Sequence, residues 1–258
     1  MPRPSYFVIG SFLLFATCFE TFEAVAEDIP ISVLRDWQDF NNSGWLAFNN
    51  HDYIKAESRF RAAINAVRPY EVQDQRLTAR SYGDLARTLY HQKRYADAEP
   101  LARWSLSVRE AHPRVNPNSV VQSLYVLAMI ERAQRRYDQA ETLLKKALAL
   151  QEKHLVPGHP DQAVIIDEMA VVAAGQGRNS DADRLFTWAL KIRQEALPAE
   201  HADIIESLEH YAAFLRRTKR VADAEPLETR VKAIYAAQAQ RAAQARAVQQ
   251  RSQRQGLK

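Results

Sequence analysis

The chain has 258 residues, of which 47% are hydrophobic and 26% charged, with a formal net charge of +4. This much apolar material can bury a core, which excludes a globally disordered chain. Seven glycines are too few for collagen, for glycine-rich phosphate loops and for most turn-dense β architectures, and a single cysteine excludes an intramolecular disulfide and a cysteine-rich zinc site.

Residues 1–26 are predicted to be a secretory signal peptide. Arg3 precedes an uncharged, mainly apolar run over residues 6–19, which is shorter than the roughly 20 residues of a membrane-spanning helix. The run leads to Ala24-Val25-Ala26, the small-residue pattern of a cleavage site. We therefore expect cleavage after Ala26 and an exported protein, periplasmic or secreted, with an uncleaved anchor or a core helix as the alternatives.

Cys18 lies inside this segment. A lipoprotein would be acylated there, but Phe15 and Thr17 stand where such a motif has leucine and a small residue, so lipidation is the disfavoured alternative. Removal of residues 1–26 would leave a mature chain without cysteine, which suits an oxidising compartment.

Residues 27–35 are expected to form a linker, and residues 36–235 a domain of five 42-residue units. Two columns of small residues carry this prediction: Gly44, Ala86, Ala128, Ala170 and Ala212, then Ala56, Ala98, Ala140, Ala182 and Ala224, each followed by an acid. Small residues at fixed positions let two helices approach closely, and the apolar residues between them recur at helical spacing. Each unit is therefore predicted to be a helix, a short turn and a second helix.

The links between units hold prolines and histidines at one phase of the repeat. His159 and His201 are one period apart, so they are interpreted as linker residues, and Asp161 and Asp203 as helix caps rather than paired catalytic carboxylates. The sequence has no HExxH, GxSxG, phosphate-loop or dinucleotide motif. We therefore predict no metal and no cofactor.

Trp104 and Trp188 occupy equivalent positions two repeats apart, in second helices. We expect them to pack in the core between units, with a contact on the convex side as the alternative.

Residues 236–258 form a tail of alanine, glutamine and arginine. Every charge from residue 229 onward is positive, so the basic isoelectric point near 9.2 belongs to the tail. The tail is interpreted as a solvated helical extension that frays, with attachment to an anionic membrane or polymer as the alternative. Nucleic acid is not expected, because no aromatic residues interleave the arginines.

The small columns, together with Tyr53, Tyr95 and Tyr137 three positions before the second column, resemble the tetratricopeptide repeat. The 42-residue period and the linker over residues 155–161 are similar to the kinesin light chain type of that repeat. The resemblance implies an all-α, right-handed superhelical solenoid of about five helix-turn-helix repeats. It also implies a concave groove that binds proteins or peptides, and proteins of this kind are rarely enzymes.

The groove positions of the family carry aromatic, methionine and arginine side chains in the first three units, and Arg80 lies about one turn before such a position. The candidate residues are Trp45, Phe48, Arg80, Arg87, Tyr90, Tyr125, Met129 and Arg132. Such side chains supply rigid anchors and contacts to carboxylates, so an acidic or aromatic-rich segment is the predicted ligand of a non-catalytic scaffold. For each residue, packing against the neighbouring helix is the alternative. Binding of an extreme C-terminal carboxylate is not supported, because Trp45 and Met129 stand where asparagine would be needed.

Two other functions stay open. One is an envelope-attached assembly or adaptor factor that docks through the basic tail. The other is an accessory subunit of an enzyme, or an enzyme in which an acid at a groove position, such as Asp167, takes part in the chemistry.

Overall fold

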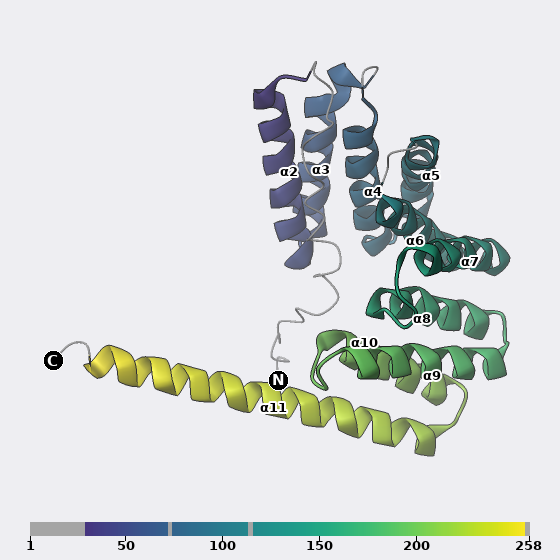
Figure 1. Ribbon diagram of the computed structural model, residues 1–258, viewed down its shortest axis with the longest axis vertical. Helices are drawn as coiled ribbons and strands as arrows, with labels where there is room; N and C mark the ends of the chain where they lie inside the picture. Colours follow the sequence, from purple (N-terminus) through teal and green to yellow (C-terminus); the bar gives the residue numbers. More distant parts are fainter. Residues whose placement is uncertain (1–28, 72–73, 113–115, 256–258) are drawn as a thin grey trace. The chain divides into compact units, whose positions relative to one another are not determined.

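The computed structural model describes residues 29–71, 74–112 and 116–255, and these residues form helices and no strand. The helices pair in chain order: α2 (Ile31–Asn49) with α3 (Tyr53–Val67), α4 (Arg76–His91) with α5 (Tyr95–Ala111), α6 (Pro117–Ala133) with α7 (Tyr137–His154), α8 (Pro160–Gly175) with α9 (Asn179–Ala196), and α10 (Ala202–Arg217) with α11 (Val221–Gln255) (Figure 1). A short 3₁₀ helix, η1 (Arg68–Tyr70), follows α3. The all-α fold with helices paired as repeats is confirmed for the described residues. The expected signal peptide, with Cys18, lies outside them.

The described helices divide into two compact units, one with α2 to α7 and one with α8 to α11. Within the first unit, α2, α3 and α4 lie side by side, with α3 in contact with both of its neighbours (Figure 1). The expected linker over residues 27–35 is partly helical, because α2 begins at Ile31.

The two small columns lie in the helix contacts, as predicted. All five alanines of the second column are fully buried, and so are Ala86, Ala128 and Ala170 of the first. Gly44 shows how close the helices approach, because a Cβ atom placed on it would lie 2.7 Å from Cε1 of Phe60 on α3. The sequence repeat is therefore a repeat of close contacts between paired helices.

A left-handed residue ends the first helix of every pair. These residues, with φ between 59° and 79°, are His51, Lys93, Arg135, Gly177 and Lys219. In each turn the amide of the next residue donates to a carbonyl five residues earlier, at 2.8–2.9 Å, for example Arg94 N to Leu89 O. This is the Schellman arrangement, in which glycine is the usual residue, yet only one of the five positions holds glycine.

In three units the acid that follows the buried alanine forms an ion pair with an arginine of the next helix pair. These ion pairs are Glu57 to Arg94 at 2.9 Å, Glu99 to Arg136 at 2.5 Å and Asp183 to Arg220 at 2.7 Å. We call this set the ionic ladder. It explains three acids of the acidic column, because each rung joins one helix pair to the next.

Glu131 on α6 is a buried acid at a position where the repeat has Leu89 and Leu215. Arg103 and Arg136 both donate to its carboxylate, and both arginines are partly exposed. The core position is thus filled by a charge that two flexible cations neutralise.

The helix caps differ from the prediction. His159 and His201 are the N-cap residues of α8 and α10, and their Nδ1 atoms accept from the amides of Asp161 and Asp203, at 3.2 and 3.3 Å. The two aspartates lie in the first helical turn, where a negative charge interacts favourably with the positive end of the helix dipole. They are not the N-cap residues. The correct assignment gives the linker histidines the capping role.

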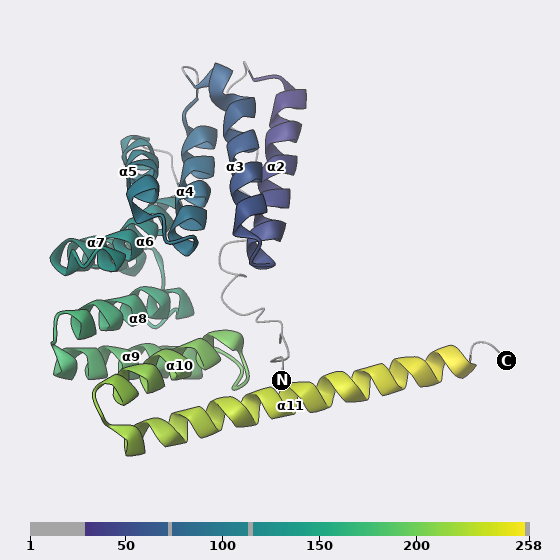
Figure 2. The same cartoon turned by 180° about the vertical axis from the view of Figure 1, so that it is seen from behind.

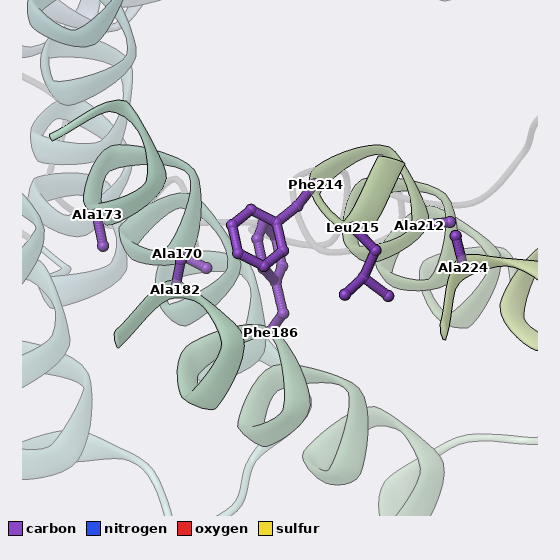
Figure 3. Packing of buried hydrophobic residues seen from close by; sticks show 8 residues of the cluster. All are labelled: Ala170, Ala173, Ala182, Phe186, Ala212, Phe214, Leu215 and Ala224. Carbon is purple, nitrogen blue, oxygen red and sulfur yellow. The ribbon is translucent and has the colours of Figure 1, made fainter. Parts of the chain in front are cut away.

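The second unit has its own core. Ala170, Ala173, Ala182, Phe186, Ala212, Phe214, Leu215 and Ala224 form one of its clusters, drawn from α8 to α11 (Figure 3). The rings of Phe186 and Phe214 lie 5.3 Å apart between α9 and α10. Small residues surround these rings, so the helices close around two aromatic side chains.

The two equivalent tryptophans have different surroundings. Trp104 is half-buried and its ring meets the ring of Tyr82 edge-on at 4.9 Å, which is a contact within one helix pair rather than the predicted packing between units. Trp188 is 45% exposed on α9, so core packing is wrong for that residue.

The C-terminal helix α11 runs without interruption through the expected boundary at residue 236 to Gln255. Both views show it extending well past α10 (Figure 2). Arg241 still bonds Glu200 at 2.6 Å, whereas residues 242–246 are exposed. The tail is therefore a helical extension of the last pair, as expected for its alanine-rich sequence.

Candidate functional site

Three charged residues lie on one face of α4 because their spacing follows the helical turn. Arg80, Asp84 and Arg87 are four and three positions apart, which places their side chains one above the other. Arg80 and Asp84 are half-buried, and Arg87 is only 9% exposed. The face belongs to the first helix of its pair.

Asp84 is the centre of this arrangement. Trp45 on α2 donates its indole Nε1–H to Oδ2 of Asp84 over 3.3 Å. Burial raises the pKa of the Asp84 carboxyl, and the positive charges of Arg80, Arg109 and Arg87, with the Trp45 hydrogen bond, partly offset that rise. Three cations thus surround one carboxylate, which leaves an excess of positive charge.

Two rings border these charges. The Arg87 guanidinium lies 5.7 Å from the centroid of the Trp45 ring, within the range of a cation–π contact. Burial lowers the pKa of Arg87, while Asp84 and then Tyr125 on α6 act in the opposite direction. We call Trp45, Arg80, Asp84, Arg87 and Tyr125 the Asp84 cluster. It draws on the first helices of three successive pairs.

The other predicted residues lie in the same unit. Arg132 on α6 donates from Nη2 to the Tyr90 hydroxyl on α4 at 2.9 Å, and both side chains are half-buried. Met129 is half-buried on α6. Phe48 is only 3% exposed, so it is a core residue rather than part of an exposed lining.

Phe48 is buried because the end of the first pair is rich in rings. Its ring meets the rings of Tyr53 and His91 edge-on, at 5.3 and 5.1 Å, and Tyr53 stacks on His91. Burial lowers the pKa of His91 to about 4, and the charges of Arg87 and His51 add to the effect. Phe48 therefore lies at a groove position of the family but takes part in the contact between the first two helix pairs.

Sequence reasoning missed Asp84. The groove positions of the repeat alignment include Arg87 and do not include Asp84. The spacing of Arg80, Asp84 and Arg87 was the available signal, because residues three and four apart share one helix face.

Asp167, considered above as an acid at a groove position, is only 4% exposed. Nδ1 of His210 on α10 lies 2.7 Å from its Oδ2 atom, and the buried Arg193 lies 3.8 Å from the same oxygen. The Asp167 carboxylate is therefore held against His210 and is shielded from solvent.

No group of histidine, cysteine, aspartate and glutamate in the described ranges is arranged to hold a metal ion. In the same part of the chain, no helix combines the length and the apolar character needed to cross a bilayer.

The sequence profile of the tetratricopeptide repeat matches residues 40–111 and 119–195, more than half of the chain. No protein of curated function matches the sequence closely enough to count as a relative.

Several solved structures share the fold. The nearly identical TPR-like repeats attributed to a Podosopora anserina kinesin light chain superpose with a TM-score of 0.61 at 19% identity, over 82% of this chain and 100% of that one. BtubC from P. vanneervenii superposes with a TM-score of 0.60 at 21% identity, over 80% of this chain and 89% of that one. A Rap protein complexed with competence and sporulation factor gives 0.69 at 16% identity, over 80% of this chain and 56% of the Rap chain. At these identities the likeness concerns the fold.

Proposed function

The chain belongs to the tetratricopeptide repeat family, and from that premise we propose that it is a non-catalytic scaffold that binds a segment of another protein or a peptide. The ligand would lie along the concave groove formed by the first helices of the repeats. The Asp84 cluster is the observation that carries this proposal, because it joins charged and aromatic side chains from three first helices.

The chemistry of the cluster favours an acidic segment with an aromatic residue. Arg80, Arg87 and Arg109 outnumber the single carboxylate of Asp84, so a ligand carboxylate would meet a positive field. Trp45 and Tyr125 are half-buried and offer rigid ring surfaces. The Rap protein among the fold neighbours is complexed with competence and sporulation factor, which is consistent with ligand binding on this fold.

The test compares an acidic peptide with its neutral counterpart, for example alternating Glu and Trp against alternating Gln and Trp, by fluorescence anisotropy at low salt. We expect Arg80→Gln to weaken binding of the acidic peptide by about tenfold, because a half-buried cation is lost. Asp84→Asn should tighten it, because the competing charge is removed while an oxygen remains to accept from Trp45. Arg61→Gln is the matched control, since Arg61 lies on the second helix α3 and pairs with Glu57.

Equal affinity for the two peptides would contradict the proposed ligand chemistry. Weaker binding by both Arg80→Gln and Asp84→Asn would show that the cluster supports the fold of the site without selecting an anion.

We also propose that the chain is exported and cleaved after Ala26, on the evidence of residues 1–26 alone. The N-terminal sequence of the protein isolated from its native host would begin at Glu27. An intact Met1, or a lipid on Cys18, would refute this.

The second candidate function is attachment to an anionic surface of the cell envelope through the tail. The observation in its favour is that α11 continues to Gln255 beyond its contact with Glu200 and carries Arg246, Arg251 and Arg254 without an acid. Co-sedimentation with vesicles that contain anionic lipid should be lost in high salt and when these arginines are replaced by glutamine. Binding that survives both changes would exclude this function.

A further inference from the structure

A second cluster of charged side chains lies in the other unit, between α8 and α10. Asp167 and Glu168 come from α8, and Glu206 and His210 from α10. Asp167 and Glu168 are 4% and 7% exposed, whereas the side chain of His210 is 45% exposed. The buried members are acids and the exposed member is the imidazole, so His210 covers the acids.

Asp167 is only partly satisfied within the protein. Its Oδ2 atom is 2.7 Å from Nδ1 of His210 and 3.8 Å from Nη1 of Arg193. Its Oδ1 atom is buried and has no hydrogen-bond partner among the described residues. Arg193 points its Nη1 atom elsewhere, to the Asp203 carbonyl at 2.9 Å and the Ser207 hydroxyl at 2.5 Å. A buried carboxylate oxygen without a donor is costly, and a ligand donor can remove that cost.

Three carboxylates act on the His210 imidazole. Burial alone would lower the pKa of His210, but the hydrogen bond from the imidazole to Asp167 and the charges of Asp167, Glu206 and Glu168 together raise it. Arg193 lies behind Asp167, 3.8 Å from its Oδ2 atom. The surroundings of the imidazole therefore favour a positive charge at this position.

We propose that this cluster is a binding subsite for a positively charged side chain, the ammonium of a lysine or the guanidinium of an arginine. When no ligand is bound, the imidazole of His210 occupies the position that the ligand cation would take. A ligand cation displaces the exposed imidazole, bonds Asp167 and Glu206, and supplies a donor to the unsatisfied oxygen of Asp167. The subsite lies in a different unit from the Asp84 cluster and takes the opposite charge, so it does not depend on the proposed function.

Displacement makes binding depend on pH in a specific direction. The charged groups that face His210 are Asp167 and Glu168 from α8 and Glu206 from its own helix, with Arg193 of α9 behind them. Among these groups, the imidazole is the one that ordinarily changes charge between pH 6 and 8. A neutral His210 competes less, so a cationic ligand should bind more tightly as the pH rises. If the ligand were held only by attraction to an acidic surface, its affinity would not change over this pH range.

The experiment measures binding of hexa-arginine and hexalysine to the full chain by calorimetry between pH 6 and 8.5. We expect the affinity to rise roughly fivefold to tenfold over this range, and His210→Gln to bind tightly at every pH. Glu206→Gln, at a half-buried position, should weaken binding by about tenfold. Glu195→Gln is the matched control, because Glu195 is exposed on α9 of the same unit and pairs with the exposed Lys191.

The source of the cation follows from a second arm of the experiment. Sedimentation of the full chain is compared with that of the variant in which Arg246, Arg251 and Arg254 are glutamine. Self-association that hexa-arginine disperses and the variant lacks would assign the subsite to the tail of a second copy. A monomer that still binds hexa-arginine would assign it to a separate basic ligand. Binding that is absent, that is independent of pH, or that Glu206→Gln and Glu195→Gln weaken equally would overturn the proposal.

Discussion

The close approach of α2 and α3 makes one substitution diagnostic of the repeat packing. In Gly44→Ala, the added Cβ atom would lie 2.7, 2.9 and 3.0 Å from three ring atoms of Phe60. Phe60 is fully buried and its ring meets Trp45 at 5.7 Å, so it cannot move away freely. The methyl group therefore forces the two helices apart.

The size of the effect follows from two opposing contributions. Overpacking of this kind costs about 1–3 kcal/mol. Alanine is favoured over glycine inside a helix by about 1 kcal/mol. The 2.7 Å contact places this site in the upper part of the overpacking range, about 2–3 kcal/mol, so we expect Gly44→Ala to lower the free energy of unfolding by about 1–2 kcal/mol.

The matched control is Gly83→Ala, the same change within α4. There the nearest atoms would be Oγ of Ser105 at 3.1 Å and Nη2 of Arg109 at 3.8 Å, so the clash is smaller than at Gly44. We expect Gly83→Ala to change the free energy of unfolding by less than about 0.5 kcal/mol, because the helix preference of alanine offsets the contact with Ser105.

Urea unfolding followed by circular dichroism measures both variants, and hydrogen exchange of α2 and α3 amides locates the change. Phe60→Leu should relieve the clash, so the double variant with Gly44→Ala should show a coupling of about 1 kcal/mol. A Gly44→Ala protein as stable as the wild type, or two glycine variants with equal effects, would refute the close approach.

Four further changes test other parts of the structure. Glu131→Leu should leave the free energy of unfolding unchanged or raise it by up to about 2 kcal/mol in urea titration, because an apolar residue replaces a buried charge, and a large loss would contradict this. Arg135→Gly should raise the free energy of unfolding slightly and Gly177→Ala should lower it by about 1 kcal/mol, because both residues have left-handed backbones. Equal shifts in urea titration would count against the turn assignment. The pKa of His91 is lowered to about 4, so its contribution to stability is present above pH 6.5 and is lost as the pH falls towards 4, and an imidazole proton resonance that titrates near 6.5 would disprove it. The pKa of His210 is raised, so its contribution is complete below pH 6.5 and is lost as the pH rises through the folded value, and His210→Gln should remove that part of the pH dependence of unfolding.

The fold was predictable because it depends on residues whose size is visible in the sequence. The alanine columns mark close helix contacts, and their 42-residue spacing gives the number of helix pairs. The turn after each first helix was less visible, since Lys93 and Arg135 occupy a left-handed position where glycine is the usual signal. Hydrogen bonds of the Schellman arrangement hold that conformation for residues that do not prefer it.

The site was less predictable, because its members depend on what lies opposite them. Phe48 has the family position of a groove residue, yet rings from α3 and α4 enclose it. Asp84 has no special position in the repeat and gains its role from Trp45 on another helix. His159 was assigned to the linker and proves to cap α8, because its Nδ1 atom accepts from an amide. A repeat alignment gives positions along the chain and does not give these partners.

The ionic ladder has a consequence for how the first unit responds to a ligand. Each rung joins a helix pair only to its neighbour, so the stability of the unit is close to a sum of pair and nearest-neighbour contributions. In such a chain the terminal pair opens first, and local opening does not require global unfolding. A ligand on the Asp84 cluster would contact three successive pairs at once and so add a link beyond nearest neighbours. Ligand binding would make the three pairs unfold together. The unfolding transition would then become sharper, and its midpoint would rise.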